Sequence, residues 1–149
     1  MKDVARNFDS PMIVMHIKGT PKQMQKDPTY TDVVGEIYEY FLERILFLQN
    51  SGVSNLILDP GIGFGKRLID NLVILRDLAD FQFLKKPLLI GASRKSMIGQ
   101  ITGQTVDKRL SGSIAVHLYG LSSGVNILRV HDVRETVDAM RVFSAIKSA

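Results

Sequence analysis

Four apolar segments of the sequence each end in residues that could bind or activate an anionic substrate. These residues are His16, Asp59, the run Ser93-Arg94-Lys95-Ser96, and Arg129 with His131. In parallel α/β folds the C-terminal ends of the strands meet at one edge of the sheet, and ligands bind there. A single polar strand end is easily explained by solvation, whereas four of four favour a real site. We therefore expect these side chains to converge on one binding site.

The segment Asp59-Pro60-Gly61-Ile62-Gly63-Phe64-Gly65-Lys66 is the densest of these candidates. A carboxylate that closes a buried strand is costly unless it is paired, and Asp59 would suit two parallel N–H donors such as the edge of an aminopyrimidinone. Gly63 allows a ligand to approach the backbone closely, and Phe64 could be a core anchor or a flat wall against an aromatic ring. The segment is not a Walker A loop, because Arg67 replaces the required Ser or Thr. A flexible turn is the alternative interpretation.

Two further groups could hold anions. The run Ser93-Arg94-Lys95-Ser96 opens a short helix expected at residues 97–102, and free N–H groups at a helix start bind anions. Arg129 and His131 are two apart on an expected strand, so both would face the same way and form a clamp suited to phosphate or diphosphate. The alternatives are a solvated basic turn for the first group and, for His131, a core histidine bonded to Asp132 or to a backbone carbonyl.

The remaining candidates carry weaker signals. Met15 lies on a strand face, where methionine is more often a core residue than a ligand contact. We include Met15 and Gly63 with the expected substrate-binding residues. His16 could orient the loop that follows it. His117 lies in the middle of an expected helix, where we expect it to be packed or solvated.

Alternating strands and helices must position these groups. Continuous runs rich in Ile, Leu and Val predict strands that are covered on both faces, at residues 12–17, 55–59, 87–92 and 125–130. Apolar residues at helical spacing predict helices at residues 34–48, 72–81, 110–121 and 137–146. Thr105 is the expected N-cap of the third of these helices. The order predicts an α/β protein with a parallel sheet.

The spacing of the expected strands limits the architecture. Their starts lie on average about 38 residues apart, so 149 residues hold four βα units, whereas an eight-unit barrel needs ~250 residues. We therefore expect residues 1–149 to form a single unit, either a small open sheet or half of a barrel.

The composition excludes several classes of protein. The chain has no Cys, which excludes disulfides, thiolate nucleophiles and Cys-ligated metals and fits a reducing compartment such as the cytoplasm. We expect no signal peptide and no membrane span, because no apolar run approaches the ~18 residues that a spanning helix needs. The net charge of +4 is mild, and the basic residues are dispersed without interleaved aromatics. We therefore expect anionic small ligands rather than nucleic acid.

Taken together, four motifs resemble dihydropteroate synthase. They are Met15-His16-x-x-Gly19-Thr20-Pro21-x-x-Met24-Gln25, Asp59-Pro60-Gly61-x-Gly63-Phe64-Gly65-Lys66, Ser93-Arg94-Lys95-Ser96-x-x-Gly99 and Arg129-Val130-His131-Asp132-Val133. They occur in that family's order and at its spacing. The resemblance implies a transferase of folate biosynthesis with a (β/α)8 barrel, which sulfonamides target. It condenses 6-hydroxymethyl-7,8-dihydropterin diphosphate with 4-aminobenzoate to give 7,8-dihydropteroate and diphosphate.

The resemblance also implies roles for single residues on the pterin side of the site. Asp59 would hold the 2-amino and ring N–H groups of the pterin, and Lys95 would contact its ring. Arg129 and His131 would hold the diphosphate, with the Val130 backbone nearby. Lys95, Arg129 and His131 are therefore the expected catalytic residues, because their charges stabilise the departing diphosphate.

On the benzoate side, the resemblance assigns the carboxylate to Ser96 and its helix N-terminus. Phe64 would lie along the benzoate ring, and Arg94 would shape the same pocket. Mg²⁺ would assist as a Lewis acid, although we expect none of its protein ligands in this chain. A homodimer is a further expectation, since members of this family dimerise through helices of the same half.

The chain departs from the family because its motifs match only units five to eight of such a barrel. The metal-ligating Asn of the first strand is absent, as are two loops that cover the benzoate and an Asp and an Asn that complete the pterin pocket. We therefore expect a truncated product that binds substrates poorly, turns over little and exposes an apolar inner face that favours self-association.

The competing interpretation is a non-catalytic, open-sheet module that binds a phosphorylated metabolite. The order of the strands separates the two hypotheses. Neighbours in the order 1-2-3-4 indicate half of a barrel, whereas a reversal of the order with helices on both faces indicates an open sheet.

Overall fold

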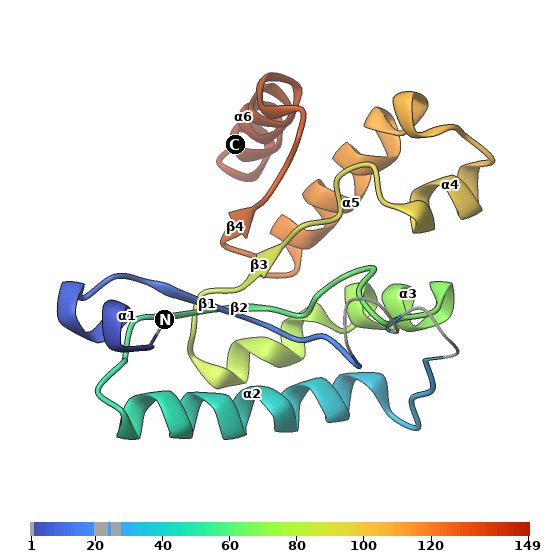
Figure 1. Ribbon diagram of the computed structural model, residues 1–149. Coiled ribbons are helices and arrows are strands. Elements are labelled where there is room, and N and C mark those ends of the chain that lie inside the picture. The colour runs from blue at the N-terminus through green and yellow to red at the C-terminus, as the bar shows by residue number, and fades with distance from the viewer. Residues whose placement is uncertain (1, 20–23, 25–27) are drawn as a thin grey trace.

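Strands and helices alternate along the chain in the computed structural model, which describes residues 2–19, 24 and 28–149. The strands of the described residues are β1 (Met12–Met15), β2 (Leu56–Asp59), β3 (Leu89–Ile90) and β4 (Ile127–Leu128). The α-helices are α1 (Lys2–Phe8), α2 (Val33–Asn50), α3 (Leu68–Arg76), α4 (Ser96–Thr102), α5 (Leu110–Ser122) and α6 (Val133–Lys147). Two 3₁₀-helices, η1 (Leu78–Leu84) and η2 (Val106–Lys108), complete the order. The predicted α/β class is confirmed (Figure 1).

The described strands are parallel and neighbour one another in chain order. β1 pairs with β2 from Met12↔Leu56 to Met15↔Asp59, and β3 pairs with β4. A parallel bridge between Leu58 and Leu88 joins the two pairs. The order is therefore β1-β2-β3-β4, and the reversal that the open-sheet hypothesis requires does not occur among these strands.

One face of β1 and β2 forms the core. Leu56, Leu58 and Val14 point to the side where α2 and η1 supply Phe41 and Phe81, whose rings meet edge to face 5.8 Å apart. Figure 1 shows α2 along one side of these two strands.

The opposite face of β1 is open. Successive residues of a strand point to opposite faces, so Ile13 lies on the other side of β1 from Val14. Ile13 is 53% exposed, whereas Val14 is buried. This agrees with the expected apolar face that no helix covers.

The predicted strands were too long at β3 and β4. Ala92 and Val125 are buried but lie outside the strands, so an apolar run reports burial rather than strand pairing. The predicted helix at residues 72–81 was also wrong, because α3 ends at Arg76 and the chain continues as η1. Apolar residues three apart fit both helix types equally well.

One helix cap was wrong, and one helix was missed. Thr105 precedes η2 instead of capping α5, whose N-cap is Arg109. The helix α1 was not predicted, because Ala5 is its single buried residue and it has no apolar stripe. No helix in the described ranges is long and apolar enough to cross a membrane.

His117 on α5 is packed, which decides between the two expectations for this residue. It is 1% exposed, and neither ring nitrogen has a hydrogen-bond partner among the described residues. Burial lowers the pKa of His117, and the Asp132 charge opposes this shift only in part. The unfolded chain therefore takes up a proton at a higher pH than the folded chain does.

We predict that the protein loses stability as the pH falls below about 6.5, the ordinary pKa of histidine. His117→Leu should raise the free energy of unfolding by about 1 kcal/mol at pH 7.5, because it removes two unsatisfied polar atoms. The gain should be larger at pH 5. Urea denaturation at both pH values measures this, and an equal or smaller gain at pH 5 would contradict the prediction.

Candidate active site

A cavity of about 270 Å³ lies where the loops after β2, β3 and β4 meet. The residues that line it are Phe64, Gly91, Ser93, Lys95, Arg129, Val130 and His131. The structure thus brings together residues that the sequence placed at the ends of three separate strands. Their roles in binding stay predictions.

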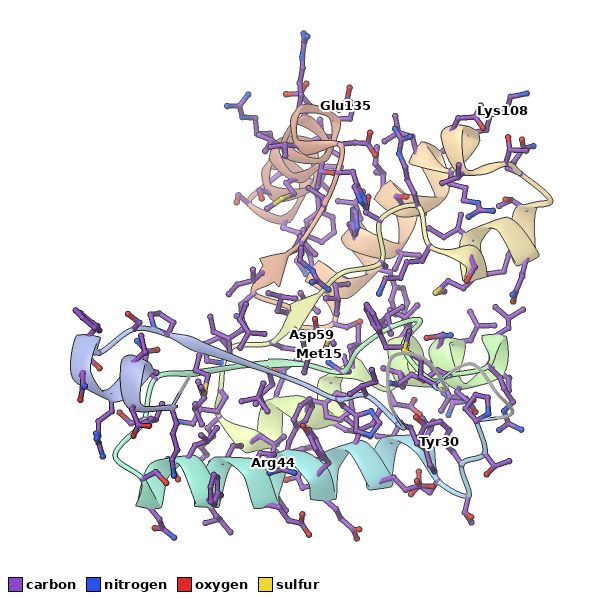
Figure 2. The ribbon with its side chains drawn as sticks, in the orientation of Figure 1. Met15, Tyr30, Arg44, Asp59, Lys108 and Glu135 are labelled. Carbon is purple, nitrogen blue, oxygen red and sulfur yellow. The ribbon has the colours of Figure 1, made fainter. Side chains whose placement is uncertain are left out.

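Asp59 is a buried carboxylate at the end of β2, beside this cavity. It is 1% exposed and pairs in register with Met15 of β1, and Figure 2 shows the two residues next to each other. The Gly61 N–H donates to Oδ1 at 2.8 Å, and Arg129 Nη2 donates to Oδ2 at 3.4 Å. Burial raises the pKa of Asp59 in spite of the Gly61 hydrogen bond and the charges of Arg129, Lys95 and Lys66. A carboxylate in this state gains from every N–H donor that reaches it.

Arg129 crosses the backbone of Gly91 on its way to Asp59. A Cβ built on Gly91 would lie 2.8 Å from the guanidinium Nε and Nη2. Any side chain at this position would therefore displace Arg129. Gly91 is a site residue that the sequence analysis missed, because it lies within the strand predicted at residues 87–92 and a glycine there carries no chemical signal of its own.

His131 stands at the rim of the cavity. Its Nδ1 lies 3.0 Å from Ser93 Oγ, which also accepts from the His131 backbone N–H at 3.2 Å. His131 is exposed, so the core-histidine alternative was wrong. Arg129 and His131 do not lie on a strand as predicted, since β4 ends at Leu128. The loop after β4 places both side chains on the same cavity.

Lys95 connects the loop after β3 to the glycine-rich loop after β2. Its Nζ donates to the Ile62 carbonyl and lies 4.3 Å from the centre of the Phe64 ring. Burial lowers the pKa of Lys95 to about 8, an effect that the Asp59 charge opposes. Gly63 leaves room for this lysine, because a Cβ there would lie 3.0 Å from Lys95 Cδ.

Besides Asp59 and Gly63, three expected substrate-binding residues lie outside the lining of this cavity. Ser96 is exposed and borders a second cavity of about 220 Å³, which Gly63 and Lys66 also line. Met15 is half-buried beside Asp59. Arg94 forms an ion pair with Asp132.

Lys66 and His16 form a buried pair whose importance the sequence did not reveal. Lys66 is 4% exposed, and its Nζ lies 3.0 Å from His16 Nδ1 and donates to the Phe64 carbonyl at 3.0 Å. Burial lowers the pKa of Lys66 to about 7 and that of His16 to about 4, and the charge of Lys66 adds to the effect on His16. The loop that His16 was expected to orient is Lys18-Gly19-Thr20-Pro21, and its last two residues lie outside the described ranges, so this role stays a prediction.

Within the described residues, no group of three His, Asp or Glu side chains is arranged to hold a metal ion. The expected assistance by Mg²⁺ stays a prediction, and no chemical step is assigned to the ion.

The fold and this site define an α/β protein of the pterin binding enzyme family. The sequence model of that family matches residues 1–131, and the chain belongs to the family.

Within the family, the chain is similar to dihydropteroate synthases. The chain is 48% identical to the dihydropteroate synthase of Escherichia coli K12 over 149 residues, which are 99% of this chain and 53% of that protein. It superposes with a TM-score of 0.95 and 39% identity on the Yersinia pestis enzyme, solved with a sulfonamide drug, and covers 54% of it. The superposition on the Thermus thermophilus enzyme, solved with 6HMPPP and with 4-aminobenzoate, has a TM-score of 0.94 and a sequence identity of 37% in both cases. These two superpositions cover 98% of this chain and 59% or 60% of the Thermus thermophilus chain. The chain thus spans about half the length of these relatives.

We predict that Lys66 makes stability rise with pH between 7 and 9. The folded pKa of about 7 is lower than the ordinary 10.5, so the unfolded chain binds more protons throughout this range. Between pH 7 and 9, Lys66→Met should reduce the increase in the free energy of unfolding by about 2 kcal/mol. Lys86→Met is the matched control, because this lysine is partly exposed and its Nζ donates to the Ser54 carbonyl. Urea denaturation at pH 7 and 9 measures the effect, and equal rises in both variants would refute it.

Proposed function

We propose that this chain corresponds to βα units five to eight of a dihydropteroate synthase barrel and carries the C-terminal share of its active site. Three observations support the proposal: the strand order β1-β2-β3-β4, the match to the family, and the superposition on synthases of which the chain covers about half. The substrates are 6-hydroxymethyl-7,8-dihydropterin diphosphate and 4-aminobenzoate. Ligands of the same kind occur in the structures of the Thermus thermophilus relative.

The convergence of one buried carboxylate and several cations on one cavity carries this proposal. Asp59 Oδ1 already accepts from Gly61, and Oδ2 has a longer contact of 3.4 Å with Arg129. The 2-amino and ring N–H groups of a pterin are parallel donors that a carboxylate accepts in one plane. Arg129 and His131 at the rim then suit the diphosphate that is attached to the same pterin.

The chemistry follows from this placement. The bond between the pterin methylene carbon and the diphosphate oxygen breaks, and Arg129 and His131 stabilise the charge on the leaving group. The Lys95 ammonium, close to the Phe64 ring, adds a further positive charge beside the same cavity. The amine of 4-aminobenzoate attacks the methylene carbon, a C–N bond forms, and the amine loses one proton. Phe64 offers a flat surface to the benzoate ring, and Ser96 is the candidate partner of its carboxylate.

The site of this chain is open on the side that faces away from its helices. Arg129 is more than half exposed, and Ile13 on the inner face of β1 is exposed as well. Electrostatic stabilisation of a leaving group is weaker where water screens the charges. The cytoplasmic location and the homodimer stay predictions.

For the 149-residue chain alone, we predict a turnover below about 1% of that of a full-length relative, since losing part of a preorganised charge cluster costs on the order of 10²–10³ in rate. The measurement is diphosphate release in a coupled assay with both substrates. Turnover within tenfold of the relative would contradict the prediction.

We predict that Asp59→Asn separates pterin recognition from anion binding. The variant should bind the pterin diphosphate on the order of 10- to 100-fold more weakly, because an amide accepts one N–H where a carboxylate accepts two. Its affinity for inorganic diphosphate should change less than threefold, because Arg129 and His131 are retained. Calorimetric titration with each ligand measures both values.

Asp138→Asn is the control, because this exposed acid lies on α6 and contacts Arg141. It should change neither affinity. If Asp59→Asn lowered the affinities for the pterin diphosphate and for inorganic diphosphate equally, this would argue against a pterin pocket. Tight binding of diphosphate by the original chain, with no preference for the pterin form, would favour a module that binds phosphorylated metabolites in general.

A further inference from the structure

We propose that Arg94 and Asp132 are positioning residues that brace the two cation-bearing loops of the site against each other. The first loop follows β3 and carries Lys95, and the second follows β4 and carries Arg129 and His131. The inference rests on the proposed function, because it assigns to Arg94 an indirect role in place of a contact with the substrate.

The ion pair between these residues is planar and two-pronged. Arg94 Nε donates to Asp132 Oδ2 at 2.9 Å, and Nη2 donates to Oδ1 at 2.5 Å. The side chains are 31% and 15% exposed, so the pair is partly shielded from water. Such pairs fix the direction of both groups as well as their distance.

Each partner is adjacent in sequence to a residue that lines the cavity. Arg94 lies between Ser93 and Lys95, and Asp132 follows His131. Neither Arg94 nor Asp132 lines the cavity itself. The pair therefore acts on the site through the backbone that it holds.

A second contact runs beside the ion pair. Ser93 Oγ meets both the backbone N–H and the ring Nδ1 of His131. The two loops are thus joined at two consecutive positions, Ser93 to His131 and Arg94 to Asp132. Two links define a relative orientation, whereas one link leaves a hinge.

The backbone of Arg94 is held in an unusual conformation to make this pair. Its φ is +53°, in the left-handed region that favours glycine and asparagine. Ser113 Oγ accepts from the Arg94 N–H at 2.8 Å, and Arg109 donates to the Arg94 carbonyl at 3.1 Å. Asn or Gly would adopt this backbone conformation more easily than Arg does. What Arg94 contributes at this position is therefore its guanidinium, which pairs with Asp132.

This conformation allows a variant that removes the brace without strain. Arg94→Asn keeps a residue that tolerates the left-handed region and removes the guanidinium. Arg94→Lys keeps the charge but cannot form the two-pronged pair. The double variant Arg94→Asp with Asp132→Arg restores opposite charges in exchanged positions. Arg76→Asn is the control, because Arg76 forms a comparable pair with Asp77 away from the cavity.

The experiment compares these variants of the 149-residue chain in three measurements. They are calorimetric titration with the pterin diphosphate, urea denaturation, and amide hydrogen exchange of the ligand-free chain. Arg94→Asn should lower the affinity about tenfold, and Arg94→Lys and the double variant should recover part of the loss. The urea midpoint of Arg94→Asn should shift no more than the urea midpoint of the control Arg76→Asn. Exchange should speed up in both loops and stay unchanged in α2.

The outcomes distinguish the brace from the proposed function. If the original chain does not bind the pterin diphosphate, the proposed function fails, and amide exchange alone decides on the brace. Unchanged exchange in either loop of Arg94→Asn overturns the brace. An affinity loss that Arg94→Lys and the double variant do not recover at all overturns it too.

Discussion

A buried carboxylate that faces cations from several loops is the interaction on which the site depends. Asp59 is removed from water at the end of β2, and an isolated buried charge is very costly. Arg129 comes from the loop after β4, Lys95 from the loop after β3, and Lys66 from the loop after β2. Their charges offset this cost only in the arrangement that brings the three loops to one edge of the sheet. The same arrangement leaves cations at the rim for an anionic ligand.

The backbone supplies the room that this arrangement needs. Gly61 has a φ of +69°, and a Cβ there would lie 2.0 Å from the His16 carbonyl oxygen. The absence of a side chain lets the loop turn back so that its N–H reaches Asp59. Gly91 does the same for the side chain of Arg129. Small residues at two strand ends therefore matter as much as the charged residues that they accommodate.

Local chemistry made much of the candidate site predictable. Asp59, Phe64, Lys95, Arg129 and His131 were expected at strand ends, and the structure gathers them around or beside one cavity. The role of Lys66 was not predictable, because a lysine in a glycine-rich turn is usually solvated and here its contact with His16 spans 50 residues. The resemblance predicted that Arg94 shapes the benzoate pocket, and this stays a prediction. The structure adds that Arg94 forms an ion pair with Asp132, which the sequence did not predict.

The sequence by itself determined the alternation of strands and helices, because apolar periodicity reports which faces are buried. It did not determine the ends of β3 and β4, the break between α3 and η1, or the packed state of His117. Those depend on where hydrogen-bond partners lie in space, and a sequence pattern carries no such distances. Tertiary structure also decided which charges meet, since the partners of each buried ion come from segments far apart in the chain.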